Sequence, residues 1–323
     1  MEKVITKKTI DIIVPFFNEQ EVVVEFVNIL TDHVSKIEEE NPNILFKYIF
    51  VENGSTDNTY KILLDQISNK NEFSLIKLVR NFGIDGGIRA GLMKSTSDAA
   101  IILHGDLQDN PKIINNLISS WEEGFEQVVV RYDPKERENF TRKLGTYFYY
   151  KWATYASDGL IISGVSDYRL VSKKIKKLIN NLEEKIFLLR GIFIWPGYEY
   201  KIIEEKKDKR HSGKSNVNFP TVLKYLKLPI SLSTRVLYFI PIVSSIIFVL
   251  SILFVLITLI YFLITGELII QIEPRLTLLI FINITLLMMV GILSAYIGII
   301  FEEIKKRPSF IIDHINNEKS LND

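Results

Sequence analysis

The chain has 323 residues, a formal net charge of +1 and no cysteine. The near-neutral balance gives no indication of a nucleic-acid partner, and the lack of cysteine excludes disulfides, thiolate metal sites and cysteine nucleophiles. The first residues do not form a secretory signal pattern, because their apolar run is short and is interrupted at Pro15. We therefore expect the N-terminal part of the chain to stay in the cytoplasm.

Residues 1 to about 215 alternate between strand-like and helix-like segments. Strands are predicted over residues 10–15, 46–51, 74–79, 99–103 and 127–131. Helices are predicted over residues 23–37, from a cap at Thr56 or Asp57 through Leu63, over 85–95, and from Pro111 to Gly124. This alternation predicts a mostly parallel sheet that is covered on both faces and binds ligands at the carboxyl ends of its strands.

Two stretches near the C-terminus, residues 236–265 and 276–301, contain no charged residue. Each is longer than the roughly 20 apolar residues that cross a bilayer core as a helix. Buried core helices are the alternative, but helices of this length normally keep a polar stripe. The flanking cations, by the positive-inside rule, place both ends of the pair in the cytoplasm: Lys224, Lys227, Arg235, Lys305, Lys306 and Arg307. The sequence thus predicts a multi-pass protein of the cytoplasmic membrane, with the first domain and both termini inside.

Polar side chains follow the fourth predicted strand at alternate positions, at His104, Asp106 and Gln108. If the strand geometry continues, these three share one face. Oxygen ligands suit Mg²⁺ or Mn²⁺, which complete their coordination with substrate phosphates. The alternative is an ordinary polar turn before a helix that is capped by Asp109.

Glu52 and Asn53 end the second predicted strand and precede a Gly-Ser-Thr-Asp turn. A turn followed by a helix cap explains part of this segment. The functional interpretation places both side chains in a nucleoside pocket, since an Asn amide can donate to and accept from a base edge.

Taken together, these segments resemble family 2 glycosyltransferases with a GT-A fold. The matching segments are residues 13–19 (IVPFFNE), 51–55 (VENGS) and 104–106 (HGD). The chain is further similar to the polyprenyl-phosphate branch of that family, which includes dolichol-phosphate mannose synthase and the bactoprenol glucosyltransferases. The narrower matches are residues 80–83 (RNFG), 106–109 (DLQD), 167–170 (DYRL), 187–191 (FLLRG) and 210–215 (RHSGKS). The chain departs from the branch pattern at Asn53, His104, Asn110 and Asn216, where an acidic residue, Asp, Pro and Lys are common.

The resemblance implies a GT-A domain at residues 1–215, a juxtamembrane interfacial segment at 216–235, two transmembrane helices within 236–301 and a cytoplasmic tail at 302–323. The implied donor site consists of Pro15, Glu19, Glu52, Asn53, Asp85, Arg210 and Lys214. The implied metal ligands are Asp106, Gln108 and His104, and the implied acceptor-phosphate residues are Arg131, Arg142 and Thr146. Asp106 and Asp167 are the catalytic candidates; the alternative for Asp167 is a structural pair with Arg169.

The resemblance implies inverting transfer of a sugar, with glucose or another hexose as the best match, from a nucleotide-sugar to a polyprenyl phosphate such as undecaprenyl phosphate. A UDP-sugar donor, an Mg²⁺ or Mn²⁺ cofactor, contact with the lipid bilayer and a homo-oligomer, a tetramer by analogy, are implied with it. The product would be a polyprenyl-phosphate-sugar donor for cell-envelope glycans. Two alternatives remain. A catalytically impaired membrane scaffold is supported by Asn53 and His104, and a polysaccharide synthase lacks support because the chain has no Gln-x-x-Arg-Trp segment.

Overall fold

The computed structural model describes residues 7–68, 70–132, 140–184, 188–205, 229, 231–233, 235–266 and 274–316. Arg210 and Lys214 of the predicted donor site lie outside these residues, as does most of the predicted interfacial segment.

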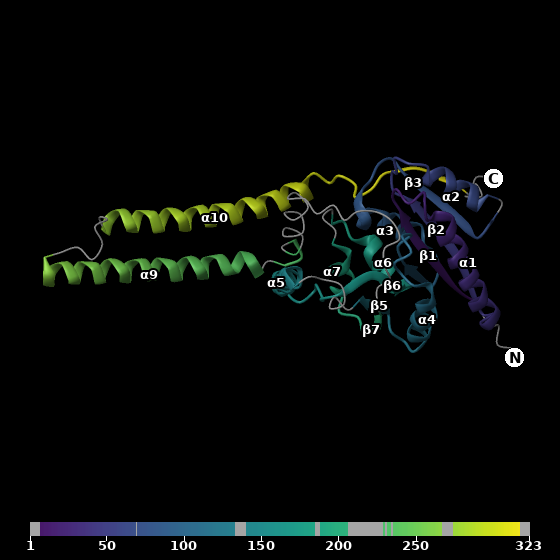
Figure 1. Ribbon diagram of the computed structural model, residues 1–323, viewed down its shortest axis with the longest axis horizontal. Helices are drawn as coiled ribbons and strands as arrows, with labels where there is room; N and C mark the ends of the chain where they lie inside the picture. Colours follow the sequence, from purple (N-terminus) through teal and green to yellow (C-terminus); the bar gives the residue numbers. More distant parts are fainter. Residues whose placement is uncertain are drawn as a thin grey trace.

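Within the described residues, eight strands form one mixed sheet in the order β7-β5-β6-β4-β1-β2-β3-β8 (Figure 1). The strands are β1 (Lys8–Phe16), β2 (Ile44–Glu52), β3 (Phe73–Leu78), β4 (Ala99–Ile102), β5 (Gln127–Tyr132), β6 (Val165–Ser172), β7 (Tyr200–Glu205) and β8 (Ile312–Asn316). β6 and β8 run antiparallel to their neighbours, and the other strand pairs are parallel. The predicted α/β class with a mostly parallel sheet is therefore confirmed.

Helices cover both faces of this sheet. The helices are α1 (Val23–Glu40), α2 (Thr59–Ile67), α3 (Gly83–Lys94), the short 3-10 helix η1 (Pro111–Ile113), α4 (Ile114–Glu122), α5 (Phe140–Ala156), α6 (Lys173–Asn181) and α7 (Leu189–Ile194). Side chains of a strand point alternately to its two faces, so Ile12 and Val14 of β1 pack with α1, α2 and α4, while Ile13 packs with α3, α6 and α7. Because helices bury both faces, the ends of the strands are the part of the sheet that remains accessible to ligands.

The predicted strands agree with β1 to β5 within two residues at either end, and α1 and η1 begin at the predicted Val23 and Pro111, but the starts of α2 and α3 differ from the prediction. α2 begins at Thr59, after the predicted cap at Thr56 or Asp57, and its N-cap residue Asn58 makes no side-chain cap bond. The Asp57 carboxylate instead accepts from the backbone N–H of Thr59 at 3.0 Å. Asp109 is not a helix cap, because Asn110 accepts from the Lys112 N–H and the Asp109 carboxylate faces the interior.

A strand beyond the two apolar helices is absent from the sequence prediction, which treats residues 302–323 as a tail. β8 pairs antiparallel with β3, and Phe310, Ile312 and Ile315 pack onto the core beside α3. The His314 imidazole and the Tyr60 hydroxyl of α2 are 2.5 Å apart. The chain therefore returns from its last long helix to complete one edge of the sheet.

Two long helices, α9 (Arg235–Thr265) and α10 (Pro274–Ile304), lie side by side and extend away from the sheet (Figure 1). Their segments Ser245–Thr265 and Phe281–Ile304 are long and apolar enough to cross a membrane, with mean hydropathy of 3.1 and 2.4. Only 6% and 0% of these windows are buried in the protein. Helices of a soluble core would be covered, so this exposure fits the predicted hairpin.

The close approach of α3 to the sheet gives a test of the packing. A Cβ at Gly91 would lie 2.3 Å from the Ile13 Cγ2 atom, whereas a Cβ at Gly145 of α5 would meet no atom within 4 Å. We expect Gly91→Ala to lower the free energy of unfolding by about 1–3 kcal/mol through overpacking. Gly145→Ala, the matched control, should leave it unchanged or raise it by about 0.5–1 kcal/mol through helix propensity. Urea unfolding in detergent, followed by tryptophan fluorescence, checks both; equal effects would contradict the packing.

Candidate active site

The candidate site lies where β1, β2, β4 and β5 end at one edge of the sheet. β6 runs the other way, so it begins at this edge and brings Asp167 there. The register pairs Ile102 of β4 with Arg169 of β6, and two residues further on this alignment sets His104 opposite Asp167. Residues 63 positions apart in the chain therefore meet because one strand is reversed.

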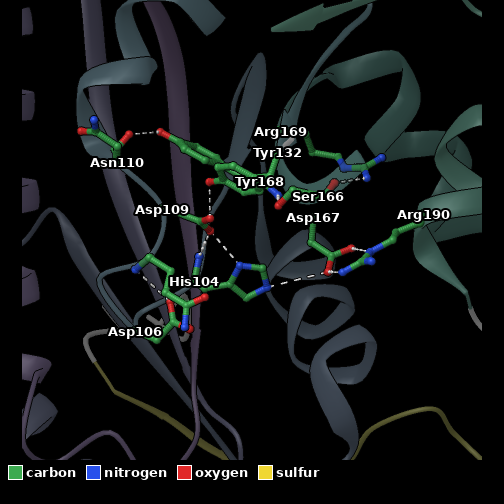
Figure 2. Close-up of polar contacts among 11 residues, drawn as sticks. His104, Asp106, Asp109, Asn110, Tyr132, Ser166, Asp167, Tyr168, Arg169 and Arg190 are labelled. Carbon is green, nitrogen blue, oxygen red and sulfur yellow. Dashed lines mark hydrogen bonds and ion pairs between the residues drawn. The ribbon is translucent and has the colours of Figure 1, made fainter. Parts of the chain in front are cut away.

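His104 is the centre of a polar network at this edge (Figure 2). Its Nδ1 donates to the Asp109 carboxylate at 2.7 Å, and its backbone N–H donates to the same oxygen at 2.9 Å. The second Asp109 oxygen accepts from the Tyr132 hydroxyl at 2.6 Å. The His104 Nε2 lies 3.8 Å from a carboxylate oxygen of Asp167. Both nitrogens of the ring thus face carboxylates.

Charge in this network favours an imidazolium. Burial alone lowers the pKa of His104, but the carboxylates of Asp109, Asp167 and Asp106 outweigh burial and raise that pKa above its ordinary value. Burial likewise tends to raise the pKa of Asp109, and the charge and hydrogen bonds of His104, with the Tyr132 hydroxyl, bring it below its ordinary value. The Nδ1 of His104 is engaged by Asp109, so Nε2, which faces Asp167 at 3.8 Å, is the ring nitrogen left for another partner.

Asp167 is held by Arg190, which sequence reasoning gave no role. The Arg190 Nε and Nη2 donate to the two carboxylate oxygens of Asp167 at 2.8 and 2.6 Å. Arg169, the predicted structural partner of Asp167, instead donates to the Ser166 carbonyl at 2.7 Å and lies over the Phe193 ring. The predicted structural pair of Asp167 with Arg169 is therefore wrong, because the side chain that pairs with Asp167 is Arg190. Arg190 lies within the segment 187–191 that carried the family resemblance, and this was the available signal.

The turn after β4 changes the expected alignment of the three predicted metal ligands. β4 ends at Ile102 and Leu107 adopts a left-handed φ of 60°, so the strand geometry that would align His104, Asp106 and Gln108 does not continue. The Asp106 carboxylate accepts from the Gln108 N–H at 3.2 Å. The described residues contain no group of three His, Cys, Asp or Glu arranged to hold a metal ion. Asp106 and Gln108 are nevertheless partly exposed oxygen donors on one turn, which fits an ion such as Mg²⁺ that keeps several waters.

The loop after β2 and the start of α3 form the predicted nucleoside end. The Asn53 amide is buried and joins the two, because its oxygen accepts from the Phe82 N–H at 3.0 Å and its nitrogen donates to the Gly83 carbonyl at 2.9 Å. A Cβ on Gly87 would lie 3.0 Å from the Pro15 Cβ and 3.5 Å from the Asn53 nitrogen. Asn53 and Pro15 are therefore neighbours. In this conformation, however, the Asn53 amide positions a turn and does not present a free edge.

The loops after β1 and β2 are joined by hydrogen bonds. The Asn18 side chain accepts from the Thr56 N–H at 2.8 Å, and the Glu19 N–H donates to the Thr59 hydroxyl at 2.9 Å. Glu52 accepts from the Ser55 N–H within its own loop. Asn18 is a non-glycine residue with a φ of 55°, a conformation that Asn tolerates better than most residues. Sequence reasoning included Glu19 and Glu52 but did not identify Asn18, whose role depends on the loop that it meets.

The other predicted residues are spread around the same end of the sheet. Asp85 lies in the first turn of α3 and accepts from the Leu189 N–H at 3.4 Å. Arg131 lies 3.5 Å from the Glu204 carboxylate of β7, and its Nε is buried without a hydrogen bond. Thr146 lies on α5. Arg142 also belongs to α5, but its side chain lies outside the described part of the chain.

Asp109 provides a test of the network. We expect Asp109→Asn to lower the pKa of His104, because the substitution removes the nearest carboxylate while burial of the ring remains. NMR titration of the histidine ring signals of the full chain in detergent micelles measures this pKa. Asp65→Asn, on the exposed side of α2, is the matched control and should leave the titration of His104 unchanged. An equal pKa in the Asp109 variant would show that the contact does not set the charge of the ring.

Comparison with known proteins agrees with this architecture. A model of the family described as Glycosyl transferase family 2 matches residues 11–183. CsbB, a Bacillus subtilis protein named as a glycosyltransferase, is 29% identical over 310 residues, which cover 95% of this chain and 92% of the relative. The SfII prophage-derived bactoprenol glucosyl transferase of Shigella flexneri is 27% identical over 311 residues, covering 94% and 97%. The prophage bactoprenol glucosyl transferase homolog of Escherichia coli is 26% identical over 314 residues, covering 95% and 99%.

Among solved structures, S. aureus TarS 1-349 in complex with UDP-GlcNAc superposes loosely, with a TM-score of 0.47 and 13% identity over 68% of this chain and 65% of that one. The family match stands independently of this superposition. It extends from β1 to the end of α6 and includes the loops that carry Glu52, Asp106 and Asp167. Because the family model spans more than half of the residues, the chain belongs to glycosyl transferase family 2.

Proposed function

We propose that this protein transfers a sugar from a nucleotide-sugar to a polyprenyl phosphate in the membrane, with inversion at the anomeric carbon. The observation that carries the proposal is the direct attachment of a family 2 domain to two exposed, bilayer-length apolar helices. A soluble acceptor would not require such an anchor, whereas a long isoprenoid tail keeps its phosphate at the membrane surface. Relatives that match almost the whole chain are named bactoprenol glucosyl transferase.

The membrane arrangement supports a lipid acceptor. α5 contacts the base of α9, where Asp158 and Arg235 form an ion pair at 3.0 Å (Figure 1). α5 exposes the aromatic rings of Tyr147 and Phe148, which are 61% and 59% exposed. Aromatic side chains of this kind suit the boundary between water and bilayer. In the proposed arrangement the protein is multi-pass, and the catalytic domain and both termini lie in the cytoplasm.

A cavity of about 550 Å³ lies where the two long helices meet the domain. Its walls combine the apolar side chains of Leu160, Trp195 and Leu232 with the hydroxyl-bearing Ser233 and Tyr296. A lining that is partly apolar and partly polar, next to the long helices, is compatible with a polyprenyl phosphate, whose tail is apolar and whose phosphate end is polar. The cavity thus supports entry of the acceptor from the membrane side of the domain.

On the donor side, Pro15, Glu19, Glu52, Asn53 and Asp85 are proposed to surround the nucleoside, with uridine favoured. Arg210 and Lys214 are proposed to close over the diphosphate, since guanidinium and ammonium groups are the usual phosphate partners in proteins. Glucose or another hexose is the proposed sugar.

Asp106 and Gln108 are the proposed ligands of the Mg²⁺ or Mn²⁺ ion, because they supply partly exposed oxygen atoms on the turn beside the network. When bound, the ion would neutralise negative charge on the leaving diphosphate. The chain itself positions the turn through Asp109, which anchors the backbone of His104 five residues earlier.

The proposed nucleophile is the lipid phosphate. An oxygen of the phosphate attacks the anomeric carbon, the bond from that carbon to the donor diphosphate breaks, and the nucleoside diphosphate leaves with the electron pair. A phosphate monoester has a second pKa near 6, so it is largely ionised at neutral pH and needs no strong base. Arg131, Arg142 and Thr146 are the proposed acceptor-phosphate residues, and Asp167 is proposed to orient hydroxyl groups of the sugar. The product is then a polyprenyl-phosphate-sugar for cell-envelope glycans, made by a homo-oligomer.

The first test is direct transfer. Purified protein in detergent is incubated with undecaprenyl phosphate, Mg²⁺ or Mn²⁺ and a panel of radiolabelled nucleotide sugars, and label in the organic phase is counted. We expect one donor to transfer and Asp106→Asn to reduce the rate by about 100-fold or more, as for the loss of a preorganised electrostatic group.

Asp32→Asn, on the exposed face of α1, is the matched control and should transfer at the wild-type rate. If no donor transfers with either metal, the proposal fails and the scaffold alternative gains support. If Asp106→Asn transfers normally, the reaction class stands but the role of Asp106 does not.

The stereochemistry gives a second, independent test. Attack by the phosphate in a single displacement predicts that an α-linked donor yields a β-linked lipid product. The anomeric proton coupling and the carbon–phosphorus couplings of the isolated product distinguish the two anomers by NMR. A product that retains the donor configuration would exclude direct attack by the lipid phosphate.

A further inference from the structure

Arg190 offers more hydrogen-bond donors than Asp167 uses. A guanidinium carries five N–H donors, and Asp167 accepts from Nε and Nη2 only. Nη1 makes no hydrogen bond to any residue that the structure describes. The Asp167 side chain is 4% exposed and the Arg190 side chain is 41% exposed. The carboxylate is therefore buried against a guanidinium whose side chain is itself partly open to solvent at the candidate site.

Arg190 lies away from the proposed metal turn. In Figure 2, Asp106 and Arg190 are on opposite sides of His104, and Asp167 lies between His104 and Arg190. An anion that contacts Arg190 would thus approach the site from the side of His104 opposite Asp106 and the donor diphosphate proposed to lie there.

The other neighbour of Arg190 is α5. The Asp167 carboxylate is the main cause that raises the pKa of Arg190, and the Tyr150 phenol of α5 adds to it, which places that side chain near the guanidinium. Tyr150, Thr146 and Arg142 are four residues apart in α5, so they lie along one face of the helix. Arg190 is therefore within electrostatic range of the helix face that is proposed to receive the lipid phosphate.

We propose that the free edge of Arg190 binds the phosphate of the polyprenyl acceptor while its other edge holds Asp167. This inference rests on the proposed function and adds to it a phosphate-binding residue contributed by α7. The fork of a guanidinium can serve two anions at once, since its donors point along different edges of one plane. The shared guanidinium would fix the acceptor phosphate at a set distance from the carboxylate that is proposed to orient the sugar.

A purely structural explanation is that the ion pair only ties α7 to β6. In that case the pair could be broken from either side with the same result. The two partners differ in exposure, and this difference gives the explanations different kinetic consequences. Loss of a phosphate contact raises the KM for the acceptor, whereas loss of an orienting carboxylate lowers kcat.

The experiment compares Arg190→Gln, Arg190→Lys and Asp167→Asn in the full chain, with undecaprenyl phosphate varied at a saturating donor concentration. Arg190→Gln is expected to raise the acceptor KM by about 10- to 100-fold, the range for loss of a charged hydrogen bond. Arg190→Lys, which keeps the charge without the fork, should show a smaller rise. Asp167→Asn should lower kcat and leave the acceptor KM within about 2-fold of the wild type. Lys201→Gln, which breaks the exposed pair with Glu123, is the matched control and should behave as the wild type.

Calorimetric titration with UDP and Mn²⁺ provides a readout that does not depend on transfer. Arg190→Gln should bind UDP as the wild type does, because Arg190 does not contact the donor in this proposal. An unchanged acceptor KM in a folded Arg190→Gln protein overturns the inference, and so does an equal loss of UDP affinity. If Arg190→Gln does not fold, the acceptor KM of Arg190→Lys decides, and a value equal to that of the wild type overturns the inference. Failure of the wild-type protein to glycosylate the lipid would instead overturn the proposed function, so the two failures are distinct.

Discussion

The antiparallel pairing of β6 with β4 is the constraint on which the candidate site depends. A fully parallel sheet would bring the end of each strand to the ligand edge and would leave the start of β6 at the opposite edge. The reversal instead places Asp167 two residues beyond the last paired position, opposite His104. From there the contacts continue through Asp109 to Tyr132 of β5 and through Arg190 to α7. One strand direction thus connects four elements.

Buried charges in this region are matched in pairs. Both carboxylate oxygens of Asp167 accept hydrogen bonds from Arg190. One oxygen of Asp109 accepts from His104 and the other accepts from Tyr132. Arg169 is the exception: it is fully buried, its Nε and Nη1 have no hydrogen-bond partner, and it lies over the Phe193 ring. Leaving a buried donor without a partner costs about 1–3 kcal/mol. Arg169 keeps one hydrogen bond, from Nη2 to the Ser166 carbonyl, so its two unpaired donors are a local cost beside the matched pairs.

Local patterns were enough to predict β1 to β5, the helices between them and the apolar hairpin, because the hydrophobic periodicity and the turn residues of these elements involve residues that are close together in the sequence. Placement of Glu52 and Asp106 at one edge also followed from strand order, whereas Asp167 was a candidate through the family resemblance and reaches this edge only because β6 is antiparallel. What could not be predicted depends on contacts between distant segments: the partner of Asp167 is 23 residues away, and Asn53 bonds to a turn 29 and 30 residues later. The predicted alignment of His104, Asp106 and Gln108 on one face was not found, for a local reason. Leu107 has a left-handed φ, and a leucine at that position does not indicate one.

The return of the chain to β8 changes how the domain is attached to its helix pair. α9 is joined to the domain beside α5, and α10 is joined to it through β8 at the far edge of the sheet (Figure 1). A domain that is tethered through a single connecting segment can rotate about that segment. Two separated points of attachment define an axis, so the domain can rock about the line between them but cannot turn freely above the bilayer. The opening of the site would then keep a fixed orientation about the bilayer normal relative to the helix pair.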